Sequence, residues 1–254
     1  PYSSTQFASK KLINLFVIGI PCIPNFNKKV KAHNQGPIRI LHSPSHPAAK
    51  GSKKIVQVID NLKQRGHLLE FIMLQGRPNN EVLIEIEKCD FIIDQIYSDT
   101  PMAGFAMEAA WFGKPAVVGG YELESLKKYF PEKSMYPPSQ ICHPDDLEGA
   151  IEKLIIDENY RLNLGNAAKK FVHVQWSADK VAQRYMRLIN DDVPNSWWIN
   201  PYNVTYVYGG GQTEEQTKAN IQKLVNDYGK EALKLTDRPD LEKAFMQFAE
   251  IEEA

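Results

Sequence analysis

The sequence predicts an α/β protein built on a Rossmann-like, doubly wound parallel sheet, followed by a helical C-terminal extension. Three observations predict this fold. Short apolar runs alternate with segments of helical spacing from residue 38 onward, the connections between them are short, and glycines stand where helices should end. In such a sheet ligands bind beyond the carboxyl ends of the strands, so the loops there are where a site is expected.

The expected strands and helices alternate along the first half of the chain. The first strand, at 38–41, precedes a helix over 52–65 with apolar residues every three or four positions, ended by Gly66. Three more strands follow, at 68–74, 90–96 and 115–118, with helices between them at 79–88 and 101–112. Asn79 or Asn80 is expected to cap the helix at 79–88. Thr100 is expected to cap the next helix, with Pro101 at its first position.

The later half is predicted to be mainly helical. Its helices are expected from residue 144, at 158–173, at 177–190, from Thr213 to Tyr228 and from Asp240 onward, with a capping box at Thr213 to Gln216. The segment 191–212 breaks this pattern and is rich in Trp and Tyr. Residues 10–24 imitate a signal peptide, but no small-residue cleavage site follows. We therefore expect a buried strand there, broken by Gly19 and Pro21.

Charge and cysteine content exclude several classes of protein. The net charge is −1, so bulk electrostatics favour neither nucleic acid nor an acidic membrane surface. The three cysteines, Cys22, Cys89 and Cys142, are widely spaced and form no C-x-x-C pair. This pattern indicates a reducing compartment, hence a cytoplasmic location, and argues against a disulfide framework or a zinc site.

Lys50, Gly51 and Ser52 form the first candidate binding loop. They open a helix directly after a strand and a proline-broken loop, where free amides and the helix dipole attract anions. A lysine at this place suits a phosphate group; a solvated lysine at a helix end is the alternative. His42 and His46 lie four residues apart in the same loop. Without a helix to place them on one face, we expect no metal there.

The second candidate loop follows the strand at 90–96. With Thr100 as the cap, the backbone amides of Met102, Ala103 and Gly104 would point at the crevice, and small residues let a ligand approach closely. Glu108 lies about two turns into an otherwise apolar helix, where a carboxylate is costly unless it is paired. It can accept two ribose hydroxyls, or it can be a salt-bridged glutamate.

Four features in fixed order carry a resemblance to a known family. They are Lys50-Gly51-Ser52 at a helix start, Leu74-Gln75-Gly76 at a strand end, the strand CDFIID at 89–94, and the run EAAWFGKPAV at 108–117. The last looks like the signature E-A-x-x-x-G-x-P-V of the group-1, retaining glycosyltransferases of the GT-B fold. The segment HPDDL at 143–147 also resembles the family. The resemblance covers roughly residues 15–190 and is to the carboxyl-terminal, donor-binding domain.

The resemblance implies two Rossmann-like domains with a cleft between them, the second of which binds a nucleotide sugar without cofactor or essential metal. It implies that Lys50 contacts the diphosphate and takes part in catalysis, together with Glu108, which holds the ribose. The amides of Met102 to Gly104 would hold phosphate or sugar hydroxyls, and Gly76 and Arg77 would lie near the nucleobase.

The sequence departs from the family pattern at two positions. Ser45 stands where the family usually has an arginine, five residues before its lysine. Thr100 stands where the family often has a second glutamate, with Asp99 beside it as a substitute. Less positive charge therefore faces the diphosphate, and hydrogen bonds from Ser45 and His46 are expected to compensate.

These expectations divide the chain into three parts. Residues 1–36 are read as a linker and remnant strand from an N-terminal acceptor domain, 37–190 as the nucleotide-sugar-binding domain, and 191–254 as an aromatic-rich strap with C-terminal helices. The tail either covers the surface of the missing domain, contacts the acceptor, or packs as a strap.

The expected function is retaining transfer of a hexose from a nucleoside-diphosphate sugar to a hydroxyl acceptor, in polysaccharide or glycoconjugate biosynthesis. The acceptor would be a saccharide, a lipid-linked molecule or another alcohol, and peripheral membrane contact would come through the absent domain. A nucleotide-sugar epimerase of the same architecture and a non-catalytic nucleotide-sugar-binding module remain alternatives.

Overall fold

A five-stranded parallel sheet forms the centre of the protein. The computed structural model describes residues 12–21, 36–123, 125–200 and 210–251. The strands are β2 (Ile38–His42), β3 (Leu69–Met73), β4 (Phe91–Ile93), β5 (Ala116–Gly119) and β6 (Gln140–Cys142). Their order across the sheet is β3-β2-β4-β5-β6, and every neighbouring pair is parallel. The predicted α/β, Rossmann-like class is confirmed.

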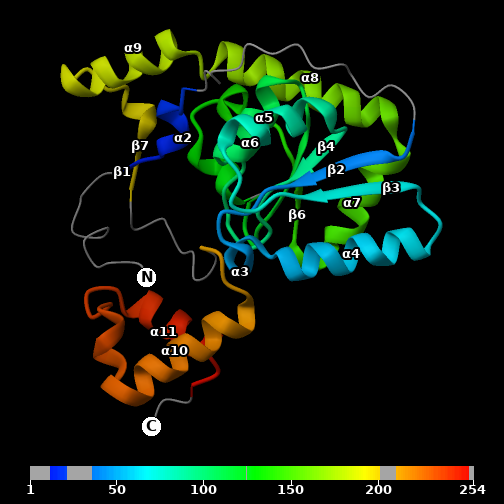
Figure 1. Ribbon diagram of the computed structural model, residues 1–254. Helices are drawn as coiled ribbons and strands as arrows, with labels where there is room; N and C mark the ends of the chain where they lie inside the picture. The colour runs from blue at the N-terminus through cyan, green and yellow to red at the C-terminus, as the bar shows by residue number, and fades with distance from the viewer. Residues whose placement is uncertain (1–11, 22–35, 124, 201–209, 252–254) are drawn as a thin grey trace.

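Helices cover both faces of this sheet, as Figure 1 shows. On one face lie α4 (Ser52–Gln64) and α7 (Leu147–Ile156); on the other lie α5 (Asn79–Lys88), α6 (Gly104–Trp111) and α8 (Glu158–Val174). Successive strand residues alternate between the faces, because side chains of a strand point to opposite sides. Ile40 packs with α4 and α7, whereas Leu41 packs with α5 and α6.

The helix predicted over 52–65 shows how local sequence sets an element's end. Gly66 has φ +94°, a left-handed conformation that favours glycine. The amide of Gly66 donates to Lys63 O and that of His67 donates to Leu62 O, at 3.0 and 3.2 Å. These two bonds form a Schellman motif, which ends α4 where the sequence predicted.

Residues 12–18 differ from the buried strand that was expected. They form a two-residue strand, β1 (Leu12–Ile13), and one helical turn, α2 (Leu15–Ile18). The cause is Asn14, whose side chain accepts a hydrogen bond from the Phe16 amide at 3.0 Å and caps the turn. β1 pairs antiparallel with β7 (Trp198–Ile199), in a small sheet separate from the main one.

Two predicted caps are also wrong. Asn79 is the first residue of α5, behind Pro78, and its side chain reaches toward α6. α6 begins at Gly104 instead of Pro101, and its N-cap is Ala103. The Pro101 carbonyl accepts from Ser139 Oγ at 2.7 Å, so it starts no helix.

Some of the remaining elements were predicted from the sequence, and others were not. The strand β6 was not predicted; the short helices are α3 (Pro47–Lys50), η1 (Ser125–Tyr129), η2 (Lys133–Met135), η3 (Pro144–Asp146), η4 (Asn195–Trp197) and η6 (Lys230–Leu233). The later helices α9 (Ala178–Ile189), α10 (Glu214–Tyr228) and α11 (Pro239–Phe248) were predicted. The capping box of α10 is confirmed: Thr213 and Gln216 exchange hydrogen bonds.

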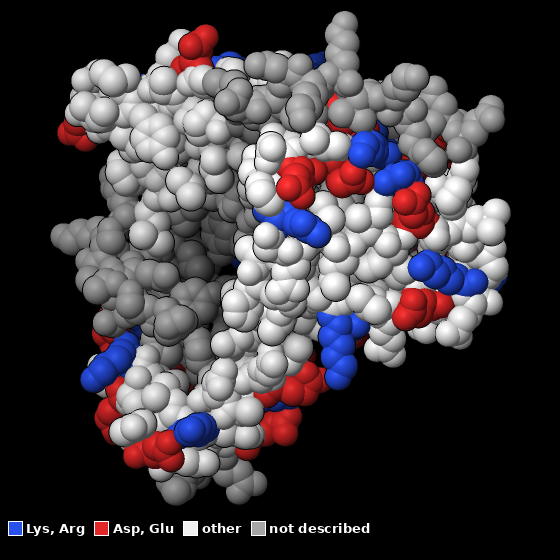
Figure 2. All heavy atoms as spheres, viewed as in Figure 1, with Lys and Arg blue, Asp and Glu red and all other residues white. Residues whose placement is uncertain are grey.

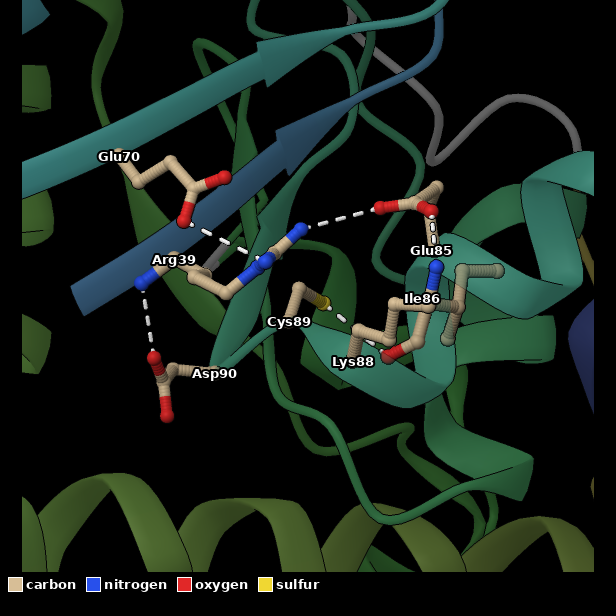
Figure 3. A network of polar contacts seen from close by, with 7 residues as sticks. All are labelled: Arg39, Glu70, Glu85, Ile86, Lys88, Cys89 and Asp90. Carbon is tan, nitrogen blue, oxygen red and sulfur yellow. Dashed lines mark hydrogen bonds and ion pairs between the residues drawn. The ribbon is translucent and has the colours of Figure 1, made fainter. Parts of the chain in front are cut away.

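Arg39 joins three elements at the amino end of the sheet (Figure 3). Its guanidinium bridges Glu70 of β3 at 3.3 Å and Glu85 of α5 at 3.1 Å, while its amide donates to Asp90 Oδ2 at 2.7 Å. Charge-assisted bonds to half-buried carboxylates are among the stronger hydrogen bonds. They fix the register of β2 against its neighbours, far from the carboxyl ends where a ligand binds.

Charges of both signs are interspersed on the face of the protein drawn in Figure 2. In the face drawn in Figure 2, lysines and arginines alternate with aspartates and glutamates, and neither sign forms a broad patch. This agrees with the net charge of −1. Within the described ranges, the helices are too short or too polar to cross a bilayer.

Candidate functional site

The sheet has one topological switch point, between β2 and β4. The chain leaves β2 through α3 and α4 to reach β3 on one side, then returns through α5 to β4 on the other side. The loops after β2 and β4 therefore diverge beyond the carboxyl ends of these strands, and we call the region between these loops the crevice. In doubly wound sheets this is the usual ligand position.

Buried hydrogen bonds of His42 fix the loop after β2. His42 is fully buried, and its ring nitrogens lie 2.8 Å from Ile93 O and 2.8 Å from Ser52 Oγ. Because a carbonyl can only accept, Nδ1 carries the proton and Nε2 accepts from the Ser52 hydroxyl. Burial lowers the pKa of His42, which agrees with a neutral ring that ties β2, β4 and α4 together.

Gly51 brings the start of α4 against the loop after β4. Its φ is +76°, and a Cβ at this position would lie 2.2 Å from Cγ1 of Ile96. A larger residue is therefore excluded both by conformation and by contact. The close approach places Lys50, the preceding residue, at the crevice.

Lys50 forms an ion pair with Asp94, the first residue after β4. The Asp94 side chain is almost completely buried, and its Oδ2 lacks a partner among the described residues. Lys50 therefore lies beside this strand end, and its counterion Asp94 was not predicted from the sequence. An ammonium has three donors, so the bond to Asp94 leaves Lys50 able to donate to a ligand as well.

The first turn of α6 faces the same region, three residues later than predicted. Its first intrahelical bond runs from the Met107 amide to Ala103 O, at 2.8 Å. Ala103 has no side chain that can cap, so the amides of Gly104, Phe105 and Ala106 are the donors of the first turn. Among the predicted amides, Gly104 keeps this role. Met102 is instead buried in the core, and Thr100 lies in the loop before the helix.

Glu108 lies one turn further along α6 and is paired, as a partly buried carboxylate requires. Its Oε1 accepts from Asn79 Nδ2 at 2.9 Å. Burial raises the pKa of Glu108, the bond from Asn79 opposes this rise, and the charge of Asp94 adds to it. Glu108 is thus held by Asn79, and Asp94, which is paired with Lys50, is near enough to influence its pKa.

The other predicted residues lie around this centre. Gly76 has φ +65°, and Arg77 is exposed with a weak ion pair to Glu81 at 4.0 Å; both follow β3, just before Asn79. Ser45 and His46 are exposed, and His46 Nδ1 accepts from the Ala49 amide at 3.4 Å, which caps α3.

Asp99 lies on the opposite side of the crevice, toward β5. Its Oδ1 accepts from the Glu122 amide at 2.7 Å, and its Oδ2 lacks a partner among the described residues. Burial raises the pKa of Asp99 to about 6, although the backbone amides of Glu122 and Tyr121 act in the other direction. A pocket of about 460 Å³ opens beside this loop, beyond β5 and β6, with Glu122, His143 and Lys153 in its wall.

Residues 211 and 212, before α10, pass over three of these loops. The Gly211 amide donates to Tyr97 O at 3.0 Å, and Tyr121 Oη donates to Gln212 O at 3.0 Å. A Cβ on Gly211 would lie 2.9 Å from that of Ala49 in α3. No signal in the sequence indicated that the segment before α10 contacts these loops.

The described residues offer no metal centre and no reactive thiol. Within those ranges, no three His, Cys, Asp and Glu side chains are grouped to hold a metal ion. Cys89 and Cys142 are free and buried, and burial raises the pKa of each to about 12. Cys22 lies outside the described residues.

Comparison with known proteins finds similarity only to solved structures. No family model and no curated protein matches the sequence. Over 61–66% of its length, the chain is structurally similar to retaining glycosyltransferases of the GT-B fold. HepE of Anabaena in complex with UDP-glucose has 13% identity and a TM-score of 0.43, with 61% of this chain and 49% of that chain covered.

Two other solved structures give similar values. TarM of S. aureus has 12% identity and a TM-score of 0.47, over 66% of this chain and 39% of that one. The catalytic domain of starch synthase IV of Arabidopsis thaliana, bound to ADP and acarbose, has 14% identity and a TM-score of 0.41. The match covers 63% of this chain and 39% of that one. The chain thus spans about half or less of the length of these structures. At this level the likeness concerns the fold, which the strand order of the sheet establishes independently.

Proposed function

We propose that the crevice binds a nucleoside-diphosphate sugar and that this chain supplies the donor-binding domain of a retaining glycosyltransferase. The observation that carries the proposal is the position of Lys50, paired with Asp94, and of Glu108, paired with Asn79, in the segments that follow β2 and β4 at the switch point. A cation for phosphate and a carboxylate for ribose hydroxyls are the two recognition groups that a nucleotide needs.

Each part of the donor has a counterpart in the site. The diphosphate would lie between Lys50 and the first-turn amides of α6, where the dipole of the helix favours negative charge. The ribose would lie at Glu108, with Asn79 holding the carboxylate in place. The nucleobase would lie toward Gly76 and Arg77, and the sugar toward Asp99 and the pocket beyond β5.

The chemistry that these residues support is electrostatic. As the bond between the sugar and the diphosphate breaks, negative charge develops on the leaving phosphate. The Lys50 ammonium and the amides of α6 are held in place beforehand, so they stabilise this charge without rearranging. Removal of one such donor typically slows an enzyme by about 100-fold or more.

A second candidate is a module that binds the nucleotide sugar without catalysis. One observation favours it: Lys50 is already paired with a buried carboxylate, and Ser45 stands where the family usually has an arginine. Such a site carries little net positive charge toward a diphosphate, so it would bind its ligand and stabilise the leaving group weakly.

Calorimetric titration tests the proposal. UDP, GDP, ADP and their hexose conjugates are added to the wild type, to Glu108→Gln and to Lys50→Met. We expect saturable binding of one nucleotide, weakened at least about tenfold by each substitution. Lys54→Met is the matched control, because Lys54 pairs at the surface with Asp145. Equal nucleotide affinity in all variants, or no nucleotide binding at millimolar concentration, would contradict the proposed donor site.

Turnover distinguishes the candidates once a nucleotide is known. Release of nucleoside diphosphate that depends on an added hydroxyl acceptor indicates a transferase. Release without an acceptor indicates the epimerase alternative, and binding without any release indicates the non-catalytic module.

A further inference from the structure

A second pocket, of about 430 Å³, lies between the end of η1 and β7. We propose that this pocket binds a saccharide. Its assignment as the acceptor subsite rests on the function proposed above, whereas saccharide binding itself does not. The volume is within the range of small-molecule sites, roughly 300–1,000 Å³.

A hydrophobic cluster holds the two walls of the pocket together. Phe130 and Trp197 are buried with Val17 and Ile18, which fastens the segment after η1 to the segment before β7. The next residue outward on each side, Tyr129 and Trp198, then lines the pocket. Because the cluster anchors both walls, the aromatic rings are positioned before any ligand arrives.

The lining combines aromatic rings with hydrogen-bonding groups. Tyr129, Phe130 and Trp198 supply ring surface, while Ser196, Asn200 and Lys128 supply a hydroxyl, an amide and an ammonium group. The Lys128 ammonium lies 5.0 Å from the centre of the Tyr129 ring. Among the described lining residues there is no carboxylate, in contrast to the pocket beyond β5, whose lining includes Glu122 and Asp146.

This chemistry fits a pyranose better than other small molecules. A pyranose ring presents C–H groups on its faces, which pack against aromatic rings, and hydroxyls around its edge, which exchange hydrogen bonds with amide and hydroxyl groups. Lys128 is the only cation among the described lining residues, and a phosphate would need more than one. A purely apolar ligand would leave the hydroxyl of Ser196 facing it without a hydrogen bond from the ligand.

The pocket lies on the side of the protein toward which the strands of the main sheet point (Figure 1). The β5–β6 connection passes the donor crevice at Tyr121 and then supplies Tyr129 and Phe130 to the pocket. Within this connection, Tyr136 Oη donates a hydrogen bond of 2.9 Å to Leu123 O. In Figure 1, β7 lies on the side toward which the arrows of β2 and β3 point. The aromatic pocket therefore lies toward the carboxyl ends of the strands, where the donor crevice is proposed (Figure 1).

Calorimetric titration with neutral disaccharides, maltose and cellobiose, tests the saccharide site in the absence of any nucleotide. We expect saturable binding of one of them, weakened at least about tenfold by Trp198→Ala, since stacking on an aromatic ring contributes about 1 kcal/mol or more. Asn200→Ala, an exposed position outside any helix or strand, should weaken binding severalfold with the fold intact. Tyr228→Ala, an exposed aromatic on α10 that does not line the pocket, should leave binding unchanged.

Each outcome decides the proposal. Absence of disaccharide binding at millimolar concentration, or binding that Asn200→Ala and Trp198→Ala leave unchanged, would overturn it. If Trp198→Ala does not fold, the Asn200→Ala result decides. Disaccharide binding without any nucleotide binding would support this pocket and reject the proposed donor site; nucleotide binding alone would do the reverse.

Discussion

Removal of the Lys50 side chain should destabilise the protein before any ligand is added. Lys50 and Asp94 are an ion pair whose side chains are 16% and 1% exposed, so Asp94 depends on Lys50 for neutralisation. The Lys50→Met substitution keeps most of the aliphatic stem and leaves a buried, uncompensated carboxylate. Breaking such a pair from one side typically costs about 3–5 kcal/mol.

The size of the effect follows from burial, and a surface pair supplies the comparison. Lys54 and Asp145 are 30% and 78% exposed, and a pair of that kind contributes about 1 kcal/mol or less. We therefore expect Lys54→Met to change the free energy of unfolding little. The double variant Lys50→Met with Asp94→Asn removes both charges together and should recover most of the stability lost in Lys50→Met.

Urea unfolding at neutral pH, followed by circular dichroism, measures all of these variants. The double variant also separates stability from binding, because it should fold well and yet bind nucleotide poorly. If Lys50→Met costs less than about 1 kcal/mol, the pair is solvated and the reasoning from burial fails. If the double variant is as unstable as Lys50→Met, the unpaired carboxylate is not the cause.

Two further predictions concern the walls of the crevice. Gly51→Ala should destabilise by more than about 3 kcal/mol, because a positive φ and an overlap with Ile96 add together; Gly66→Ala, with φ +94° and no atom within 4 Å, should cost about 1 kcal/mol in the same urea experiment. Equal losses would contradict the contact argument. The pKa of Asp99 is about 6 in the folded protein against an ordinary 3.8, so the folded protein binds the carboxyl proton more tightly than the unfolded chain does. Ionisation of Asp99 therefore destabilises the folded state. The wild type should therefore lose stability relative to Asp99→Asn as the pH rises from about 4 to 6; a constant difference over that range would show that Asp99 is not desolvated.

Local patterns were sufficient to predict much of the fold. The end of α4 follows from Gly66, and the start of α10 follows from the exchange of bonds between Thr213 and Gln216. Both depend on residues close in sequence, so the sequence alone could predict them. β6 was missed because a strand of three residues shows no periodicity.

The site depended more on contacts between residues far apart in sequence. Lys50 was predicted at a helix start, but its counterion Asp94 lies 44 residues away. The same holds for Glu108, whose partner Asn79 was expected to cap its own helix. The start of α6 shifted because Ser139, from another part of the chain, binds the Pro101 carbonyl. Sequence reasoning selected candidate side chains but could not supply the contacts that orient them.

The central claim is that the switch-point crevice binds the diphosphate of a nucleotide. An amide-resolved NMR titration with the tightest-binding of UDP, GDP and ADP tests it most directly. The account predicts that the largest shifts fall at two separate places, Gly51–Ser52 and Gly104–Ala106, with smaller shifts around Asn79. Shifts that cluster elsewhere, or that leave both helix starts unchanged at saturation, would contradict the account.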